Sequence, residues 1–258
     1  MAMKDRKTLK NYFKKGYTPS EASFEDLIDS QINKIDDGFS KTRKDGLMIS
    51  GIGGTDRLLS FFEKIQDEEA QWVINIVREG KENVDKNDLQ IADPEKQAPL
   101  LTFSKKYRIG INEPHPQYDL DVAGWIGSKG RIGTYSDNST IPADGDWHPI
   151  TPELNYCQAF EIIARTGIKD TGRHGLIHAI AVSAYGNSRS RIRKTRGYYN
   201  LWKPVRLQLR WSGTTYAYRL EMRCKQNLGR DVLVKYYVTQ LWSDEAMGVT
   251  KQFLDTDE

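Results

Sequence analysis

Apolar residues recur at three- and four-residue steps near the start of the chain, as they do along one face of an α-helix. This stripe consists of Phe24, Leu27, Ile28, Gln31 and Ile35. Thr18 and Glu21 have the spacing of a capping box, with Pro19 at the first helical position, and Gly38 follows the stripe. The pattern predicts an amphipathic helix of about four turns that ends before Gly38.

The polar Gln31 lies in the middle of this apolar stripe. A polar residue at the seam of a coiled coil fixes its register, so residues 1–44 are predicted to form a helical oligomerisation or anchor segment. The alternative is an intrachain hairpin, in which Leu9, Tyr12 and Phe13 pack back on the helix.

Short apolar runs separated by proline and glycine follow in residues 45–135. β-Branched residues predict a strand over 72–77, and shorter strands are expected at 89–91, 100–103 and 107–111. Ile109, Ile111, Leu120 and Val122 are expected to point the same way on two period-two strands. Gly110 and Gly124 lie where side chains would obstruct close strand approach. One chain offers these strands few partners, so this region is predicted to be a β-rich neck that neighbouring copies complete.

Residues 136–242 alternate between apolar and polar positions, with turn residues at the spacing of a β-sandwich. In 177–183, apolar residues occupy positions on both faces of the expected strand, which predicts a strand covered on both faces. An acidic tail, 243–258, is expected to be frayed. The whole pattern predicts a mainly β fold with an N-terminal α-helical segment, in an elongated modular protein that ends in a jelly-roll-like β-sandwich.

Charge is unevenly distributed along the chain. The net charge of the 258 residues is +3, yet 173–235 holds fourteen Lys and Arg against two acids, a net charge of +12, which leaves −9 for the rest. Such a basic segment suits an anionic partner, whereas the alternative is a solvated strand surface. The candidate binding residues are Arg189, Arg191, Arg193, Lys194, Arg196, Tyr198, Tyr199, Trp202, Arg206 and Arg210. Aromatic faces beside cations suit sugars and acidic polymers, although the aromatics could equally fill the sandwich core.

Composition excludes several classes of protein. With 38% hydrophobic and 10% aromatic residues the chain is too apolar for wholesale disorder, and its two cysteines exclude a disulfide framework or a cysteine-based zinc site. There is neither a run of about 20 apolar residues nor a secretory signal, so we expect synthesis in a reducing cytosol and no membrane span.

Residues for catalysis or metal binding do not group in the sequence. His174 and His178 have the spacing of a zinc-binding helix, but glycine and β-branched neighbours favour a strand, which separates them. Asp144 and Asp146 could bind a cation, although two carboxylates in a turn are more often turn formers. We therefore expect no catalytic activity, no metal and no cofactor.

Two segments resemble known families. LKNYFKKGYTP at 9–19 with FEDLIDS at 24–30 is similar to the N-terminal motif of fibre-like proteins in bacteriophages and prophage-like elements of Bacteroidetes-type bacteria. RIGIN at 108–112, Pro114 and LDVAG at 120–124 resemble the VGIGT-x-x-P-x-x-x-LDV-x-G repeat of tail-fibre stems, with Asn112 in place of threonine and a single copy. The end domain resembles those that follow such stems in phage tails or contractile injection systems.

The resemblance implies a virion or injection-particle component, a homotrimer with no catalysis, that attaches to a cell-surface glycan or envelope receptor or joins fibre to baseplate. Two alternatives stay open: a nucleic-acid-binding protein that uses the basic residues 189–196, and a fibre enzyme that degrades surface polysaccharide.

Overall fold

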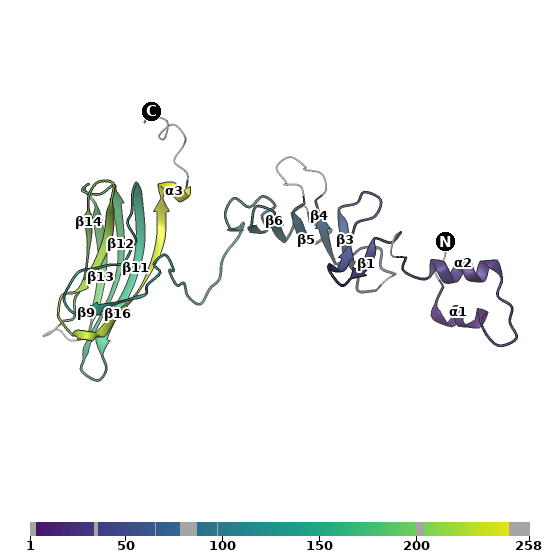
Figure 1. Ribbon diagram of the computed structural model, residues 1–258, viewed down its shortest axis with the longest axis horizontal. Coiled ribbons are helices and arrows are strands. Elements are labelled where there is room, and N and C mark those ends of the chain that lie inside the picture. Colours follow the sequence, from purple (N-terminus) through teal and green to yellow (C-terminus); the bar gives the residue numbers. More distant parts are fainter. Residues whose placement is uncertain are drawn as a thin grey trace, which may run out of the picture. The chain divides into compact units, whose positions relative to one another are not determined.

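The computed structural model describes residues 4–33, 36–64, 66–77, 87–96, 98–199 and 204–247, and the chain divides into two compact units, 1–127 and 128–258 (Figure 1). The fold is mainly β with a helical segment at its N-terminus, as predicted. Among the described residues, no helix has the length and hydropathy needed to cross a bilayer.

In the part of the first unit that the structure describes there are two short helices and two sheets. Its elements are α1 (Arg6–Tyr12), α2 (Glu21–Asp29), β1 (Phe39–Thr42), β2 (Gly46–Ile49), β3 (Arg57–Phe61), β4 (Trp72–Ile76), β5 (Leu89–Ala92), β6 (Leu101–Ser104), β7 (Arg108–Ile111) and β8 (Leu120–Val122). Strands β1 and β2 form a hairpin, and β3 to β8 form a six-stranded sheet in sequence order. All pairings in this sheet are antiparallel except that of β7 with β8, which is parallel.

The predicted four-turn helix is shorter than expected. Helix α2 begins after Ser20, whose backbone N–H donates to the Ser23 hydroxyl at 3.3 Å, so the capping pair is Ser20 and Ser23 rather than Thr18 and Glu21. The helix ends at Asp29, because the polar segment beyond it forms local bonds that compete with the helix, among them the one from the Asn33 backbone N–H to the Asp37 carboxylate at 2.6 Å. Gly38 therefore precedes strand β1 and ends no helix.

The two helices pack on one another as an intrachain pair. The rings of Phe13 and Phe24 meet edge to face with centroids 5.7 Å apart, and the Tyr12 hydroxyl donates to the Asp26 carboxylate at 3.0 Å. These contacts realise the hairpin alternative for the N-terminal segment within a single chain.

The second unit is a β-sandwich. Its elements are β9 (Thr140–Ala143), β10 (His148–Pro149), β11 (Cys157–Ile168), β12 (Arg173–Ala184), β13 (Arg191–Tyr198), β14 (Leu207–Gly213), β15 (Tyr218–Cys224), β16 (Gly229–Ser243) and α3 (Asp244–Met247). Among the described residues, one sheet has the strand order β13-β12-β11-β16-β9 and the other β10-β15-β14. Strand β16 returns to lie beside β11, which gives the 4-1-2-3 order of a Greek key to β11, β12, β13 and β16.

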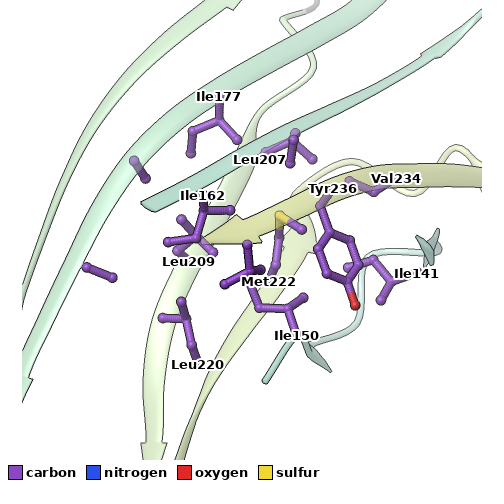
Figure 2. Packing of buried hydrophobic residues seen from close by; sticks show 14 of the residues in the cluster. Ile141, Ile150, Ile162, Ile177, Leu207, Leu209, Leu220, Met222, Val234 and Tyr236 are labelled. Atoms are coloured by element: carbon purple, nitrogen blue, oxygen red, sulfur yellow. The ribbon is translucent and has the colours of Figure 1, made fainter. Parts of the chain in front are cut away.

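The core of the sandwich lies between its two sheets. Alternate residues of each strand point inward, so Ile162 and Ile177 of one sheet belong to the same buried cluster as Leu220 and Met222 of the other (Figure 2). The alternation predicted within 136–242 is thus realised in β14 and β15.

The start of the predicted acidic tail belongs to the sandwich. The Asp244 carboxylate accepts hydrogen bonds from the Cys157 backbone N–H at 2.9 Å and from the Trp242 indole at 2.7 Å. Fraying is therefore wrong for this first part of the tail, whereas 248–258 lies outside the described residues.

Candidate functional site

One face of the six-stranded sheet is apolar and uncovered. Cross-strand partners share a face, so the register places thirteen described apolar side chains together. They are Leu59, Phe61, Trp72, Ile74, Ile76, Leu89, Ile91, Leu101, Phe103, Ile109, Ile111, Leu120 and Val122. None of the thirteen is buried, and six are between 38% and 57% exposed. We call this surface the open face.

The opposite face of the same sheet is covered in part, over Gly110, by the chain's own loop. Val73 and Thr102 are buried there. A Cβ built on Gly110 would lie 2.0 Å from the Glu113 carbonyl oxygen, so the segment after β7 folds back directly over this glycine. The Arg108 guanidinium holds the segment by donating to the Pro116 carbonyl at 3.2 Å. A side chain at Gly110 would therefore obstruct a close approach, as predicted, but of the loop after β7 and not of a neighbouring strand. The prediction for Gly124 is wrong, because a Cβ there meets nothing within 4 Å.

The residues predicted for oligomerisation fall into two sets. Ile109, Ile111, Leu120 and Val122 lie side by side on the open face, as the pattern predicted. On α2, Phe24 contacts Phe13 but stays partly exposed, Leu27 is half-buried and Ile28 is exposed. Gln31 lies beyond the end of the helix, which removes it from any helical seam. Ile35 lies outside the described residues.

The basic residues of β13 point to two different sides of the sandwich. Arg191 and Arg193 pair with Val182 and Ile180, whose side chains point away from the core. Lys194 and Arg196 pair with the buried Ala179 and Ile177 and so point to the core side of this edge strand. Burial and the neighbouring Arg196 lower the pKa of Lys194, and the Arg196 guanidinium donates to the Leu207 carbonyl at 3.0 Å. The cluster predicted around 189–196 is therefore not one continuous surface.

The remaining candidate binding residues are scattered over the sandwich. Tyr198 and Tyr199 line a depression of about 350 Å³ with His174, whose ring meets that of Tyr199 edge to face at 6.5 Å. Arg189 lies exposed in the loop between β12 and β13, Arg206 lies exposed just before β14, and Trp202 is outside the described residues.

Arg210 belongs to an ordered polar layer on the outer side of the three-stranded sheet. Its guanidinium donates to the Glu221 carboxylate at 2.7 Å and lies 4.3 Å from the centre of the Trp147 ring. The guanidinium of Arg223 lies 4.5 Å from the same ring and donates to the Gln208 carbonyl oxygen at 2.9 Å. These arginines are stabilised by neighbours of the same unit, which reduces their freedom to bind an anion.

The outer face of the five-stranded sheet carries exposed apolar residues that sequence reasoning missed. Ile163, Leu176, Ile180 and Val182 are between 43% and 53% exposed there, so the prediction that 177–183 is covered on both faces is wrong for the single chain. In the middle of this face, Glu161 is bonded to His178 at 2.9 Å and to Arg131. The signal in the sequence was that strand β12 has apolar residues on both of its faces. That pattern does not say whether other parts of the same chain cover the outer face.

The titratable residues of the second unit serve local structure. His174 and His178 lie on strand β12 rather than on a helix, and the described residues hold no group of three or more His, Cys, Asp or Glu placed to bind a metal. Asp144 accepts from His148 at 2.9 Å and from the Asp146 backbone N–H at 3.0 Å. These bonds, with His148 as the larger cause, lower the pKa of Asp144, and the pair stabilises a turn.

Comparisons with known proteins give distant similarity to solved structures only. No protein family profile and no curated protein matches the sequence. Among solved structures, the Acinetobacter phage vB_ApiP_P1 tailspike protein is similar over 48% of this chain and 26% of its own length, at 12% identity and a TM-score of 0.25. A similarity of this size assigns neither fold nor function to the chain.

Proposed function

We propose that the chain is a homotrimeric fibre or adaptor component of a phage tail or a phage-tail-like contractile injection particle. In this role its sandwich attaches the particle to a cell surface, or joins the fibre to the baseplate, without catalysis. The observation that carries the proposal is the open face, because a chain that works alone does not expose so continuous an apolar sheet surface to water.

The size of the open face fits an interface between copies of this chain. With roughly 200 Å² for each large apolar residue, its six most exposed residues alone present roughly 500 Å² per chain, and the seven half-buried ones add to this area. A typical stable interface buries about 800 Å² on each partner. Three copies that turn these faces to a common axis therefore remove enough apolar surface from water to form a stable assembly.

The composition of the open face supports a permanent contact. None of its thirteen residues carries a charge or a polar side chain, apart from the indole N–H of Trp72. Obligate interfaces between identical subunits are more apolar than transient ones and are depleted of charge.

The resemblance to fibre stems points to the same segment. Its two matched parts, at 108–112 and 120–124, contain strands β7 and β8 and contribute four residues to the open face. This agreement between motif and exposed surface favours a trimer, which is the state that the resemblance implies. The basic residues of β13 are divided between its two faces, so they give no comparable support to nucleic-acid binding.

The solution mass of the full chain tests the assembly. Size-exclusion chromatography with light scattering should give three times the 29.6 kDa of one chain at micromolar concentration. Antibody labelling of particles from producing cells, viewed by electron microscopy, should then mark the tail. A stable monomer would contradict the proposal, and a monomer that also shifts DNA in a gel would favour the nucleic-acid alternative.

A further inference from the structure

The register of the five-stranded sheet places apolar side chains of three strands together on its outer face. Val182 of β12 pairs with Ala159 of β11, which in turn pairs with Trp242 of β16, and Ile180 follows two residues before Val182. Cross-strand partners share a face, so Trp242, which is 48% exposed, extends the apolar surface of β11 and β12 onto β16. This outer face is therefore a broad surface rather than a few isolated apolar residues.

Cations outnumber acids on the outer face. The register places four basic residues there, which are Arg165, Arg191, Arg193 and Lys235. Among the described residues that these pairings place on the face, Glu161 is the one acid, and it is bonded to His178 at 2.9 Å and to Arg131. The remaining positive charge attracts an anionic partner and repels a second copy of the same face.

A depression of about 390 Å³ lies at one end of the outer face. Ala159, Val182 and Ala184 contribute short side chains to its lining, and Trp242 and Arg189 of the β12–β13 loop line it as well. The Trp242 indole N–H donates to the Asp244 carboxylate at 2.7 Å, which fixes the orientation of the ring. One aromatic ring and one cation thus adjoin a hollow with small side chains.

The depression of about 350 Å³ described above lies at the other end of the same strands. Gly197 pairs with Leu176 there, and a Cβ built on Gly197 meets nothing within 4 Å, so this part of β13 leaves open space on the outer face. Tyr199, which is 79% exposed, and Arg165 contribute to the lining. This end of the face therefore repeats the combination of an aromatic ring, a cation and a hollow.

The two depressions are separated by a fixed length of strand β12. Val182 lines the first depression and Leu176 the second, and six steps along an antiparallel strand span about 20 Å. Ile180 and Arg193, which pair across β12 and β13, lie between them. A ligand that fills both depressions must therefore be an extended chain of units that carries negative charge between its ends.

We propose that the outer face binds an acidic polysaccharide, whose sugar rings occupy both depressions and whose anionic groups pair with Arg191 and Arg193. This inference rests on the proposed attachment function and names its ligand class. Sugar rings carry C–H groups that pack on Trp242 and Tyr199, and arginine pairs with carboxylate and phosphate groups alike. The exposed aliphatic side chain of Ile180 in the middle of the face suits the same C–H groups.

A separate cavity of about 380 Å³, which Ser188, Trp211 and Tyr218 line, is not part of the outer face, because Trp211 and Tyr218 belong to the three-stranded sheet. Acidic peptides and single-stranded nucleic acids share the negative charge of the proposed ligand. The aromatic ring at each end and the aliphatic middle favour sugar rings over both, since neither a peptide of acidic side chains nor a phosphate backbone matches apolar surface between cations.

Calorimetric titration of the full-length protein at low ionic strength tests the site. The probes are tetramers of galacturonate and of sialic acid, which carry carboxylates, a tetramer of ribitol phosphate, and the neutral maltotetraose. At least one acidic tetramer should bind roughly tenfold or more tightly than maltotetraose, and the one that does so separates carboxylate from phosphate glycans. If none of the three binds more tightly than maltotetraose, the proposal is overturned. Equally tight binding of tetraglutamate or of a DNA tetranucleotide would overturn the assignment to a polysaccharide.

A variant of the cations decides whether the outer face is the binding surface. Arg193→Gln removes one positive charge between the depressions and should weaken binding about tenfold. Arg219→Gln is the matched control, because Arg219 lies on the three-stranded sheet, 3.5 Å from the Glu153 carboxylate, and it should leave binding unchanged. Equal binding by Arg193→Gln and the wild type would overturn the proposal.

A variant of the second depression tests the extended site independently. Tyr199→Ala should weaken binding about fivefold, whereas Tyr107→Ala, at a 94% exposed position of the first unit, should not. The monomer of the sugar that binds cannot span both depressions, so its affinity should be lower by at least roughly a hundredfold. Equal affinity of monomer and tetramer would contradict a site that extends over both depressions.

The proposed function is measured separately from this site. The solution mass reports the trimer, and labelled particles report the place of the chain in the tail, and neither measurement requires a sugar. A trimeric particle component without affinity for the acidic tetramers would refute this site alone, whereas a monomer that binds them would contradict the proposed assembly.

Discussion

Replacement of Phe103 by lysine is the sharpest test of the open face. Phe103 lies on β6, between Leu89 and Ile109 of the neighbouring strands, and is 39% exposed in the single chain. In the monomer a lysine at this position can extend its ammonium into water, so the sheet should form as before. In the proposed trimer the open faces pack together, so the same ammonium group is buried beside the ammonium groups of the two other copies.

The expected loss follows from the area that Phe103 presents. Its exposed part is roughly 80 Å² per chain, which corresponds to about 2 kcal/mol of apolar burial at 25 cal/mol/Å². Three chains lose about 6 kcal/mol, or roughly a factor of 10⁴ in the association constant. Removal of three ammonium groups from water adds to the loss, so Phe103→Lys should not form a trimer at micromolar concentration.

Sedimentation velocity of wild type and variant, with circular dichroism of both, gives the answer. Tyr107→Lys is the matched control, because Tyr107 is 94% exposed in the turn between β6 and β7, away from the open face. The control should sediment as the wild type does, and Phe103→Lys should sediment as a folded monomer. A Phe103→Lys trimer as tight as that of the wild type would refute the assignment of this face as an interface.

The cover on the opposite face and the sandwich core each give a further prediction. Gly110→Ala should destabilise the first unit by about 2 kcal/mol in urea unfolding, because the added methyl group meets the Glu113 carbonyl. Gly124→Ala is the control and should leave the stability unchanged. Equal effects of the two substitutions would contradict the close approach at Gly110. Burial raises the pKa of Tyr218 to about 12 from its ordinary value near 10, so the unfolded chain ionises first and stability is lost as the pH rises from about 10 to 12. The free energy of unfolding should fall by about 2–3 kcal/mol because of this residue, as measured by denaturant unfolding at increasing pH. This fall should be absent in Tyr218→Phe. An equally steep fall in that variant would exclude Tyr218 as the cause.

Local patterns predicted the strands better than they predicted the helix. Alternation in 109–111 and 120–122 places side chains on one face whatever lies around them, since the strand period is two. The helical stripe up to Ile35 failed beyond Asp29, because side-chain bonds from Asn33 and its neighbours compete with helical ones and no packing partner outweighs them.

The candidate binding residues show the limit of a charge count. The excess of arginine in 173–235 is visible in the sequence, but the side of the sheet on which each cation lies depends on strand register and on the edge position of β13. The cavity that Ser188, Trp211 and Tyr218 line had no signal in the sequence, since its lining comes from the β12–β13 loop and from strands β13, β14 and β15.

The sequence by itself determined the mainly β class and the alternation of the strands. Its expectation that one chain offers the strands of the neck few partners is wrong, because β3 to β8 pair with one another within a single chain. The class and the alternation are local properties, because they depend on residue type and on a fixed period along the chain. Only the tertiary structure decided which faces stay open, which arginines are bound to neighbours and where a loop and three strands line a cavity. These depend on contacts between residues far apart in the chain, whose geometry no short pattern contains.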